Sequence, residues 1–360
     1  MSKSTGIVPH TLDFTFDAGT SRGVLRQKPA WYLLLRDEQG REGIGEAGPL
    51  KGLSVDDQPN FEGHLRKMAR RWEQMDWPQS PADVATFVKN QVPDAWPSIR
   101  FGLETALLDL LHGGERIIFP GDLPFGESQI PINGLIWMGD REFMFQQIGD
   151  KLDAGFTCLK MKIGAIDFAT ELDLLGYIRQ QFGPDKLILR VDANGAFAPH
   201  EAMDKLKQLA AFDLHSIEQP IMAGQVEAMQ QLCQVSPVPI ALDEELIGVA
   251  AFAERRRLLE SIRPPYIILK PSLVGGFADC DEWISLCEEL EIDWWMTSAL
   301  ESNIGLNAIS QYTAHKQAKG HQGLGTGQLY SNNIPSPMVI DRGHLCYEQS
   351  QVWDLSLIKA

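Results

Sequence analysis

The sequence is poor in basic residues relative to acidic ones. Its 360 residues contain 32 Lys and Arg against 48 Asp and Glu, which gives a formal net charge of −16 with His counted as neutral. A nucleic-acid-binding protein needs a basic face to neutralise phosphates, and adsorption to an anionic membrane surface needs the same. We therefore expect neither a nucleic acid nor a membrane as a partner.

Cysteine and long apolar segments are also scarce. The five cysteines are widely spaced and form no Cys-x-x-Cys pair, which argues against a zinc ribbon or a thioredoxin-like site. No apolar run approaches the ~20 residues of a membrane-spanning helix, and residues 1–16 lack the pattern of a signal peptide. We expect a cytoplasmic protein with reduced thiols. The oligomeric state stays open, and a homo-oligomer is compatible with the sequence.

The chain divides into three parts by its periodicity. Residues 1–125 combine a hairpin signal with helical patterns at about 54–75, 80–93 and 97–112, which predicts an α+β domain. Residues 126–327 alternate short apolar runs with longer amphipathic runs, as parallel βαβ units do. Residues 328–360 are too short for a domain, and we expect them to pack back on the N-terminal part.

Eight apolar, β-rich runs in the second part are candidate strands. They lie at 130–137, 158–163, 187–192, 216–221, 239–243, 266–271, 293–298 and 322–325. Eight strands with helical patterns between them suit a closed β/α barrel. An open doubly wound sheet is the alternative, but no Gly-rich dinucleotide-binding fingerprint follows a strand.

Charged and polar side chains stand where buried parallel strands should be apolar. Six of them recur at intervals of 25 to 30 residues, about one β/α unit each. These six are Lys162, Asp192, Glu218, Asp243, Lys270 and Ser298. They therefore occupy equivalent positions near the C-terminal ends of successive strands, the rim where a barrel carries its active site. Because side chains alternate along a strand, Lys160 shares the face of Lys162, and Arg190 and Asn194 share the face of Asp192.

This set of residues predicts a metal and a base. Three carboxylates from adjacent strands would repel one another unless a cation lay among them. Oxygen ligation by Asp192, Glu218 and Asp243 suits Mg²⁺ or Mn²⁺, whereas zinc would call for His or Cys. The ammonium of Lys160 disfavours a second positive charge beside it, so Lys162 is the candidate general base. The site would remove a proton α to a carboxylate.

Each residue taken alone has a structural interpretation. An Asp at a strand end commonly caps the next helix, and a Lys there commonly forms a surface ion pair. Five charged groups at one phase of the repeat are difficult to explain in this way, so together they favour a functional site.

At these residues the sequence resembles the enolase superfamily, whose members pair a Lys or His base with Mg²⁺. The Lys-x-Lys strand at 160–162, the Asp/Glu/Asp series and Lys270 resemble its muconate-lactonizing-enzyme subgroup. Within the subgroup, the segments 190–194, 297–305 and 19–25 are most similar to the dehydratases that form o-succinylbenzoate.

The resemblance implies a modified (β/α)8-type barrel under an N-terminal α+β capping domain that the C-terminal tail completes. It implies syn-dehydration, through an enediolate, of a small anionic carboxylate, a hydroxycyclohexadiene that bears a succinyl group, in menaquinone biosynthesis. Lys162 would take the α proton and assist departure of the hydroxyl, Lys270 would stabilise the anion from the opposite face, and Lys160 would tune Lys162. Asn194, Ser298, Arg22 and Arg190 would contact the substrate.

Two other functions stay open at this point. The first is an isomerase on the same scaffold: a muconate-type cycloisomerase, an N-acyl amino acid racemase or a dipeptide epimerase. Dipeptide epimerases carry an Asp-x-Asp that holds the substrate ammonium, whereas this chain has Ser298, Ala299 and Leu300 there. The second is a binding protein that retains the barrel without catalysis.

Overall fold

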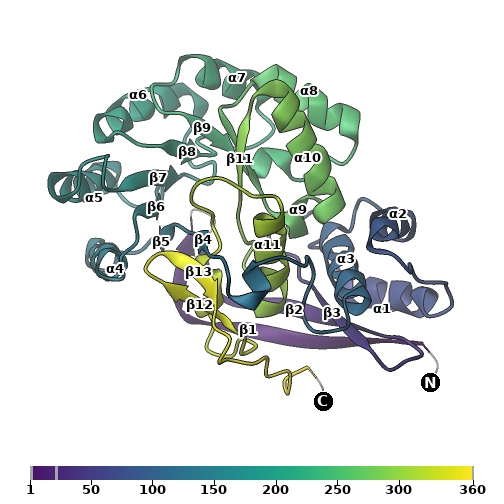
Figure 1. Cartoon of the computed structure of the whole chain (residues 1–360). Helices are drawn as coiled ribbons and strands as arrows, with labels where there is room; N and C mark the ends of the chain where they lie inside the picture. The colour runs from purple at the N-terminus through teal and green to yellow at the C-terminus, as the bar shows by residue number, and fades with distance from the viewer. Residues whose placement is uncertain (1–2, 21–22, 359–360) are drawn as a thin grey trace.

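The computed structural model describes residues 3–20 and 23–358. Figure 1 shows a ring of alternating strands and helices above a sheet of long antiparallel strands. Within the described ranges, no helix has the length and apolar composition needed to cross a bilayer.

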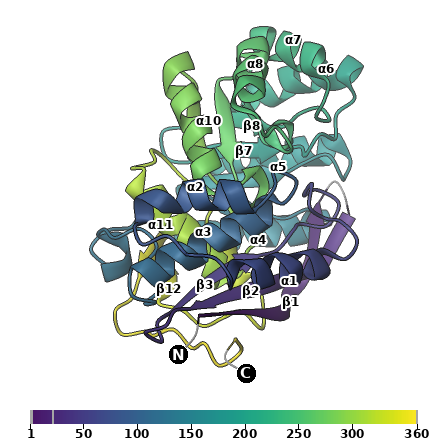
Figure 2. The same ribbon diagram turned by 90° about the vertical axis from the view of Figure 1, so that its right-hand side faces the viewer.

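The N-terminal part is an antiparallel sheet covered by helices. The sheet has the order β1-β2-β3, with β1 Ser4–Thr20, β2 Gly23–Arg36 and β3 Glu42–Ala47. The helices are α1 Phe61–Trp72, α2 Pro81–Gln91 and α3 Pro97–Leu111, and Figure 2 shows them on one side of the strands. The helix expected over 54–75 begins only at Phe61, because Pro59 and the left-handed Asn60 (φ 61°) interrupt it.

The second part is a barrel of parallel strands in chain order. Its seven-stranded sheet comprises β5 Gly134–Ile136, β6 Cys158–Lys162, β7 Ile188–Asp192, β8 Ser216–Glu218, β9 Ile240–Leu242, β10 Tyr266–Leu269 and β11 Asp293–Met296. The expected eighth strand is reduced to isolated bridges, in which Gln322 pairs with Ile132 and Gly323 pairs with Thr297. These bridges join the two edges of the sheet, so the barrel closes and the doubly wound alternative is wrong.

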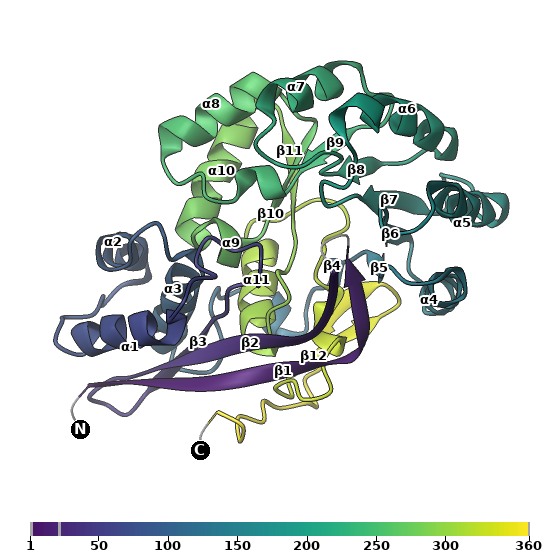
Figure 3. The same cartoon turned by 180° about the vertical axis from the view of Figure 1, so that it is seen from behind.

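Helices surround this barrel on the outside (Figure 3). They are α4 Arg141–Asp153, α5 Phe168–Gln181, α6 Pro199–Leu209, α7 Val226–Val235, α8 Phe252–Ile262, α9 Pro271–Val274, α10 Phe277–Leu290 and α11 Asn303–His315. Short 3-10 helices lie at Leu123–Phe125, Ala210–Phe212, Glu244–Leu246 and Gly325–Gln328. The predicted strand-helix alternation, and with it the fold class, is confirmed.

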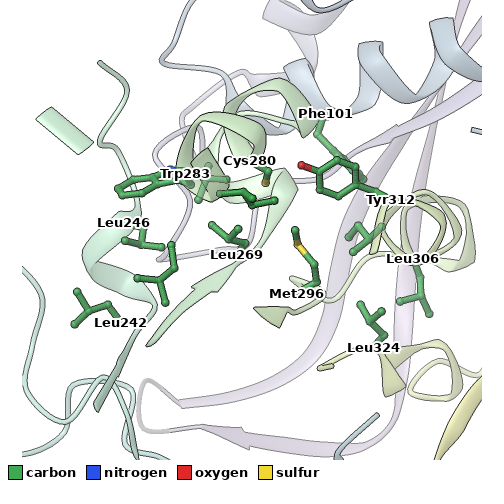
Figure 4. Close-up of a cluster of buried hydrophobic side chains, with 14 of the residues drawn as sticks. Phe101, Leu242, Leu246, Leu269, Cys280, Trp283, Met296, Leu306, Tyr312 and Leu324 are labelled. Atoms are coloured by element: carbon green, nitrogen blue, oxygen red, sulfur yellow. The ribbon is translucent and has the colours of Figure 1, made fainter. Parts of the chain in front are cut away.

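One apolar core joins the two parts. Side chains on the outer faces of the strands, such as Leu159 and Met161 of β6, are buried against the helices. Figure 4 shows part of this core, with Phe101 of α3 in the same cluster as Tyr312 of α11. Phe101 also meets Phe277 of α10 edge to face, with ring centroids 5.4 Å apart. The capping helices are therefore fixed to the barrel.

The C-terminal segment returns to both parts. Its strands β12 Met338–Asp341 and β13 His344–Tyr347 form an antiparallel hairpin that pairs with β4 Ile130–Pro131. Farther on, Ile358 is buried in a cluster with Tyr32 of β2 and Ile44 of β3. We propose that the units divide near residues 125 and 327, as the sequence predicts.

Candidate active site

A cavity lies between the capping strands and the C-terminal rim of the barrel. Its volume, counted as the space open to the centres of water molecules, is about 250 Å³. The capping side contributes Phe16, Thr20, Leu25, Leu50 and Leu53, and the barrel rim contributes Lys160, Lys162, Asp192, Asn194, Lys270 and Ser298. Mostly apolar side chains of the capping side thus face a charged rim across the cavity.

Strand register places the predicted carboxylates side by side. In the parallel ladder, Lys162 of β6 pairs with Asp192 of β7, and Asp192 pairs with Glu218 of β8. Asp243 follows directly on β9. All three carboxylates are buried, with at most 2% of each residue exposed. The unit spacing in the sequence is the origin of this convergence.

Three ammonium groups lie among these carboxylates. The Nζ atoms of Lys160 and Lys162 each lie 3.0 Å from Oδ2 of Asp192, and Lys160 also contacts Glu218. From the other wall, Lys270 contacts Asp243 and lies 3.8 Å from Glu218. The three positive charges balance the three negative ones within the buried site.

The buried charges shift one another's protonation. Burial alone would raise the pKa of Asp192, but the ammonium groups of Lys160, Lys162 and Lys270 outweigh it and hold that pKa well below its usual range. Burial, together with the charge of Asp192, raises the pKa of Glu218. Burial would lower the pKa values of Lys160 and Lys270, yet the neighbouring carboxylates raise both. Both lysines are therefore held as ammonium ions.

The oxygen atoms of Asp192, Glu218 and Asp243 are the ligand type that a hard divalent cation prefers. The three carboxylates are, however, too far apart in this structure to bind one cation together. The Glu218 carboxylate is buried and its negative charge is met by the ammonium groups of Lys160 and Lys270, the place that a bound cation would take. Within residues 3–20 and 23–358, no group of three His, Cys, Asp or Glu side chains is close enough to hold a metal as it stands. The ammonium groups of Lys160 and Lys270 lie between the carboxylates and would have to withdraw.

Asn194 and Ser298 both line the cavity, as expected for substrate contacts. Asn194, in a left-handed conformation (φ 45°), accepts a hydrogen bond from Lys162 Nζ at 2.8 Å. The hydroxyl of Ser298 donates to Glu301 at 2.6 Å and accepts from the backbone of Leu300 at 3.0 Å. Arg22, the other expected contact on the capping side, lies outside the described residues.

Arg190 is not brought to the cavity. It stands on the inward face of β7, two residues before Asp192, which places it roughly 6–7 Å deeper in the barrel. There it donates from Nη1 to the carbonyl of His321 at 2.8 Å and lies 4.1 Å from the ring centroid of Trp295. Among the described residues that line the cavity, Arg190 is absent. Its role as a substrate contact stays a prediction that this position does not favour.

Trp137 is a cavity residue that the sequence analysis missed. It lies just after β5, lines the cavity, and its ring centroid is 5.8 Å from Lys162 Nζ. Gln147 of α4 bonds to both the backbone N–H and the carbonyl of Trp137, which fixes its position. The signal was present, because Trp137 precedes Lys162 by 25 residues, one β/α unit, but an aromatic residue is unremarkable in an apolar strand.

Comparison with known proteins places the chain in a family. A family profile described as enolase C-terminal domain-like matches residues 144–349. The o-succinylbenzoate synthase of Desulfotalea psychrophila is 48% identical over 359 residues, covering 93% of this chain and 96% of that protein. The chain belongs to the enolase superfamily.

Solved structures of the enolase superfamily have the same architecture. MenC from Desulfotalea psychrophila superposes with a TM-score of 0.86 at 44% identity, covering 96% of this chain and all of that one. The L-Ala-D/L-Glu epimerase of Bacillus subtilis reaches a TM-score of 0.83 at 18% identity over 96% of both chains, a likeness of fold alone. The sequence-based recognition of the superfamily is confirmed.

Proposed function

We propose that this protein is an o-succinylbenzoate synthase. The reaction is the syn-dehydration of 2-succinyl-6-hydroxy-2,4-cyclohexadiene-1-carboxylate in menaquinone biosynthesis, so the enzyme is a lyase. The observation that carries the proposal is the 48% identity to the Desulfotalea enzyme along nearly the whole of both chains. The cavity with its lysines and carboxylates supports it, because α-proton abstraction needs such groups.

Enolase-superfamily enzymes use a divalent metal, and here we propose Mg²⁺, with Mn²⁺ as the alternative. Asp192, Glu218 and Asp243 would hold it through carboxylate oxygens, the ligands that hard cations prefer. When bound, the metal supplies positive charge beside the substrate carboxylate, which makes the adjacent α proton more acidic.

We assign the proton transfers to Lys162. Its Nζ would take the proton from C1, and the electron pair of the broken C–H bond would move into the carboxylate to give an enediolate. The same ammonium would then give its proton to the C6 hydroxyl as the C–O bond breaks, so water leaves from the face that lost the proton. Asn194 orients the Nζ atom through its 2.8 Å hydrogen bond.

Lys270 and Lys160 would act by charge. The carboxylates around them raise their pKa values, so both stay protonated at neutral pH. From the wall opposite Lys162, the ammonium of Lys270 would stabilise negative charge as it develops on the substrate. A racemase would instead need a neutral Lys270 as its second base.

The competing functions are isomerases on the same fold. Among the relatives is an N-succinylamino acid racemase of Amycolatopsis, which is only 26% identical over 68% of this chain. The higher identity to the dehydratase disfavours this alternative. The binding-protein alternative gives no reason for the chain to bear the desolvation cost of two buried lysines, a third that is largely buried, and three buried carboxylates.

The proposed function can be tested by an assay of the purified protein with Mg²⁺. We expect the hydroxycyclohexadiene substrate to be converted to o-succinylbenzoate, seen as loss of diene absorbance, and a chelator to stop the reaction. N-succinyl amino acids, dipeptides and muconolactone are tested in parallel. Turnover of one of these without dehydration of the diene would contradict the proposal.

We also propose that the protein works in the cytoplasm. All five cysteines are free thiols in the structure, as expected in a reducing compartment.

A further inference from the structure

A buried carboxylate of the capping sheet holds the barrel element next to the cavity. Glu46 of β3 is 1% exposed and accepts three hydrogen bonds at the start of α11. Its Oε1 accepts from the backbone N–H of Ser302 at 2.9 Å, and its Oε2 accepts from the Ser302 hydroxyl at 2.5 Å and from the N–H of Gly305 at 3.0 Å. The first N–H groups of a helix have no partner within it, so Glu46 caps α11 from another part of the molecule.

A buried cation accompanies this carboxylate. Lys28 of β2 is 2% exposed, and its Nζ lies 3.9 Å from Oε1 of Glu46 without a hydrogen bond to any described residue. Burial raises the pKa of Glu46, while Lys28 and the bonds from Ser302 oppose that rise. The two groups therefore depend on each other, since Lys28 without Glu46 would lose its ion-pair partner and Glu46 without Lys28 would keep its hydrogen bonds but lose the opposite charge beside it.

Residues next to Glu46 and next to Ser302 in the sequence line the cavity. After β3, the next residues include Leu50 and Leu53, which line the cavity from the capping side. Just before Ser302, the segment 298–300 forms the opposite wall. Leu300 has a left-handed backbone (φ 67°), a conformation that is unfavourable for a residue with a side chain. The hydroxyl of Tyr330 donates a hydrogen bond to the Leu300 carbonyl at 2.7 Å and so helps to hold this segment.

We propose that Glu46 is a positioning residue that sets the distance between the capping leucines and the 298–300 wall, and thereby the fit of the substrate. It does not touch the reacting atoms, so it should act on substrate binding more than on proton transfer. This inference rests on the proposed dehydration for its kinetic part, but its structural part can be measured without turnover.

The chain offers a matched control in Glu104 of α3. Glu104 is 3% exposed and caps a barrel helix from the capping side as well, since it accepts from the N–H groups of Phe277 at 2.5 Å and Ala278 at 3.3 Å. These residues begin α10, which the short helix α9 separates from the cavity residue Lys270. Glu104 thus has the same kind of contact as Glu46, but away from the cavity wall.

The test compares Glu46→Gln with Glu104→Gln. An amide has one acceptor oxygen where a carboxylate has two, so each variant loses part of its helix cap and both should lose stability. We expect Glu46→Gln to raise KM for the diene about tenfold, with kcat nearly unchanged, because misplaced walls weaken binding. Glu104→Gln should keep KM close to that of the wild type.

A second readout needs no catalysis. Lys51 is exposed between Leu50 and Leu53, so trypsin cleavage after it reports how firmly this loop is held. We expect faster cleavage at Lys51 in Glu46→Gln than in Glu104→Gln, and the double variant Lys28→Met/Glu46→Gln should regain stability while KM and cleavage stay raised.

Equal effects of the two Gln variants on KM and on cleavage would overturn the inference, because Glu46 would then be only a structural cap. A wild-type protein that does not dehydrate the diene would overturn the proposed function instead. In that case unequal cleavage at Lys51 still supports the positioning role of Glu46, and equal cleavage still rejects it.

Discussion

On β6, the alternation of side chains separates two lysines that face into the barrel from Leu159 and Met161, which face the helices. The same rule, with the regular spacing of the units, was enough to predict that Lys162 and Asp192 would meet. It also placed Arg190 on the inward face of β7, where it is found, but the face alone does not show that Arg190 lies two residues deeper than Asp192 and is absent from the described cavity lining. It also could not show that the hydroxyl of Ser298 bonds to Glu301, since that contact depends on how the loop after β11 turns.

His215 allows a prediction at the scale of a single residue. Burial, with the nearby charge of Arg190, lowers the pKa of His215 to about 4. Its ordinary value is near 6.5, so the unfolded chain binds more protons between these values. The stabilisation from the neutral ring is therefore present above pH 6.5 and is lost as the pH falls through 4.

We expect His215→Phe to flatten this pH dependence. The Phe ring can keep the stacking on Tyr266, whose centroid is 5.0 Å from that of His215. Between pH 7 and 4 the wild type should lose roughly 2 kcal/mol more unfolding free energy than the variant, a figure reduced for partial exposure. Urea titrations at several pH values measure this. Parallel pH profiles for the two proteins would show that His215 titrates normally in the fold.

At the scale of elements, the strands that recur with the β/α repeat were predictable, whereas the segment that closes the barrel was not. The seven strands β5 to β11 follow from apolar runs of local sequence. The eighth run, at 322–325, forms only bridges, because its partners Ile132 and Thr297 are set by the closure of the whole barrel. Similarly, Asn60 delays the start of the predicted first helix to Phe61 through a backbone conformation that helical periodicity does not report.

The packing of α3 on β3 gives a prediction at this scale. A Cβ on Gly45 would lie 1.9 Å from the carbonyl oxygen of Gly102, so the strand and the helix touch backbone to backbone. Gly45→Ala should force them apart and lower the unfolding free energy by about 3 kcal/mol. The control is Gly149→Ala in α4, where a Cβ meets nothing within 4 Å.

The control variant should gain about 0.5–1 kcal/mol, because Ala favours the helix more than Gly does. Denaturant midpoints of the three proteins check both changes. Similar midpoints for Gly45→Ala and the wild type would mean that the capping helix does not depend on this close approach.

For the whole molecule, the net charge of −16 disfavours the binding of anions, whereas the proposed site has to bind one. The proposed substrate carries two carboxylates, yet the protein as a whole is acidic. Around the cavity, however, three ammonium groups balance three carboxylates, so a bound divalent cation would leave a local excess of positive charge. The composition could exclude anionic polymers, but only the arrangement of the rim shows how a small anion can be bound.

The most direct test of the account compares Arg substitutions of the two facing lysines in the dehydration assay with Mg²⁺. Arginine keeps the positive charge but does not give up its proton at neutral pH. Lys162→Arg should therefore lose on the order of 10³-fold in kcat, because the base is gone, while Lys270→Arg should keep a substantial part of the activity. Wild-type turnover in Lys162→Arg would contradict the assignment of Lys162 as the base.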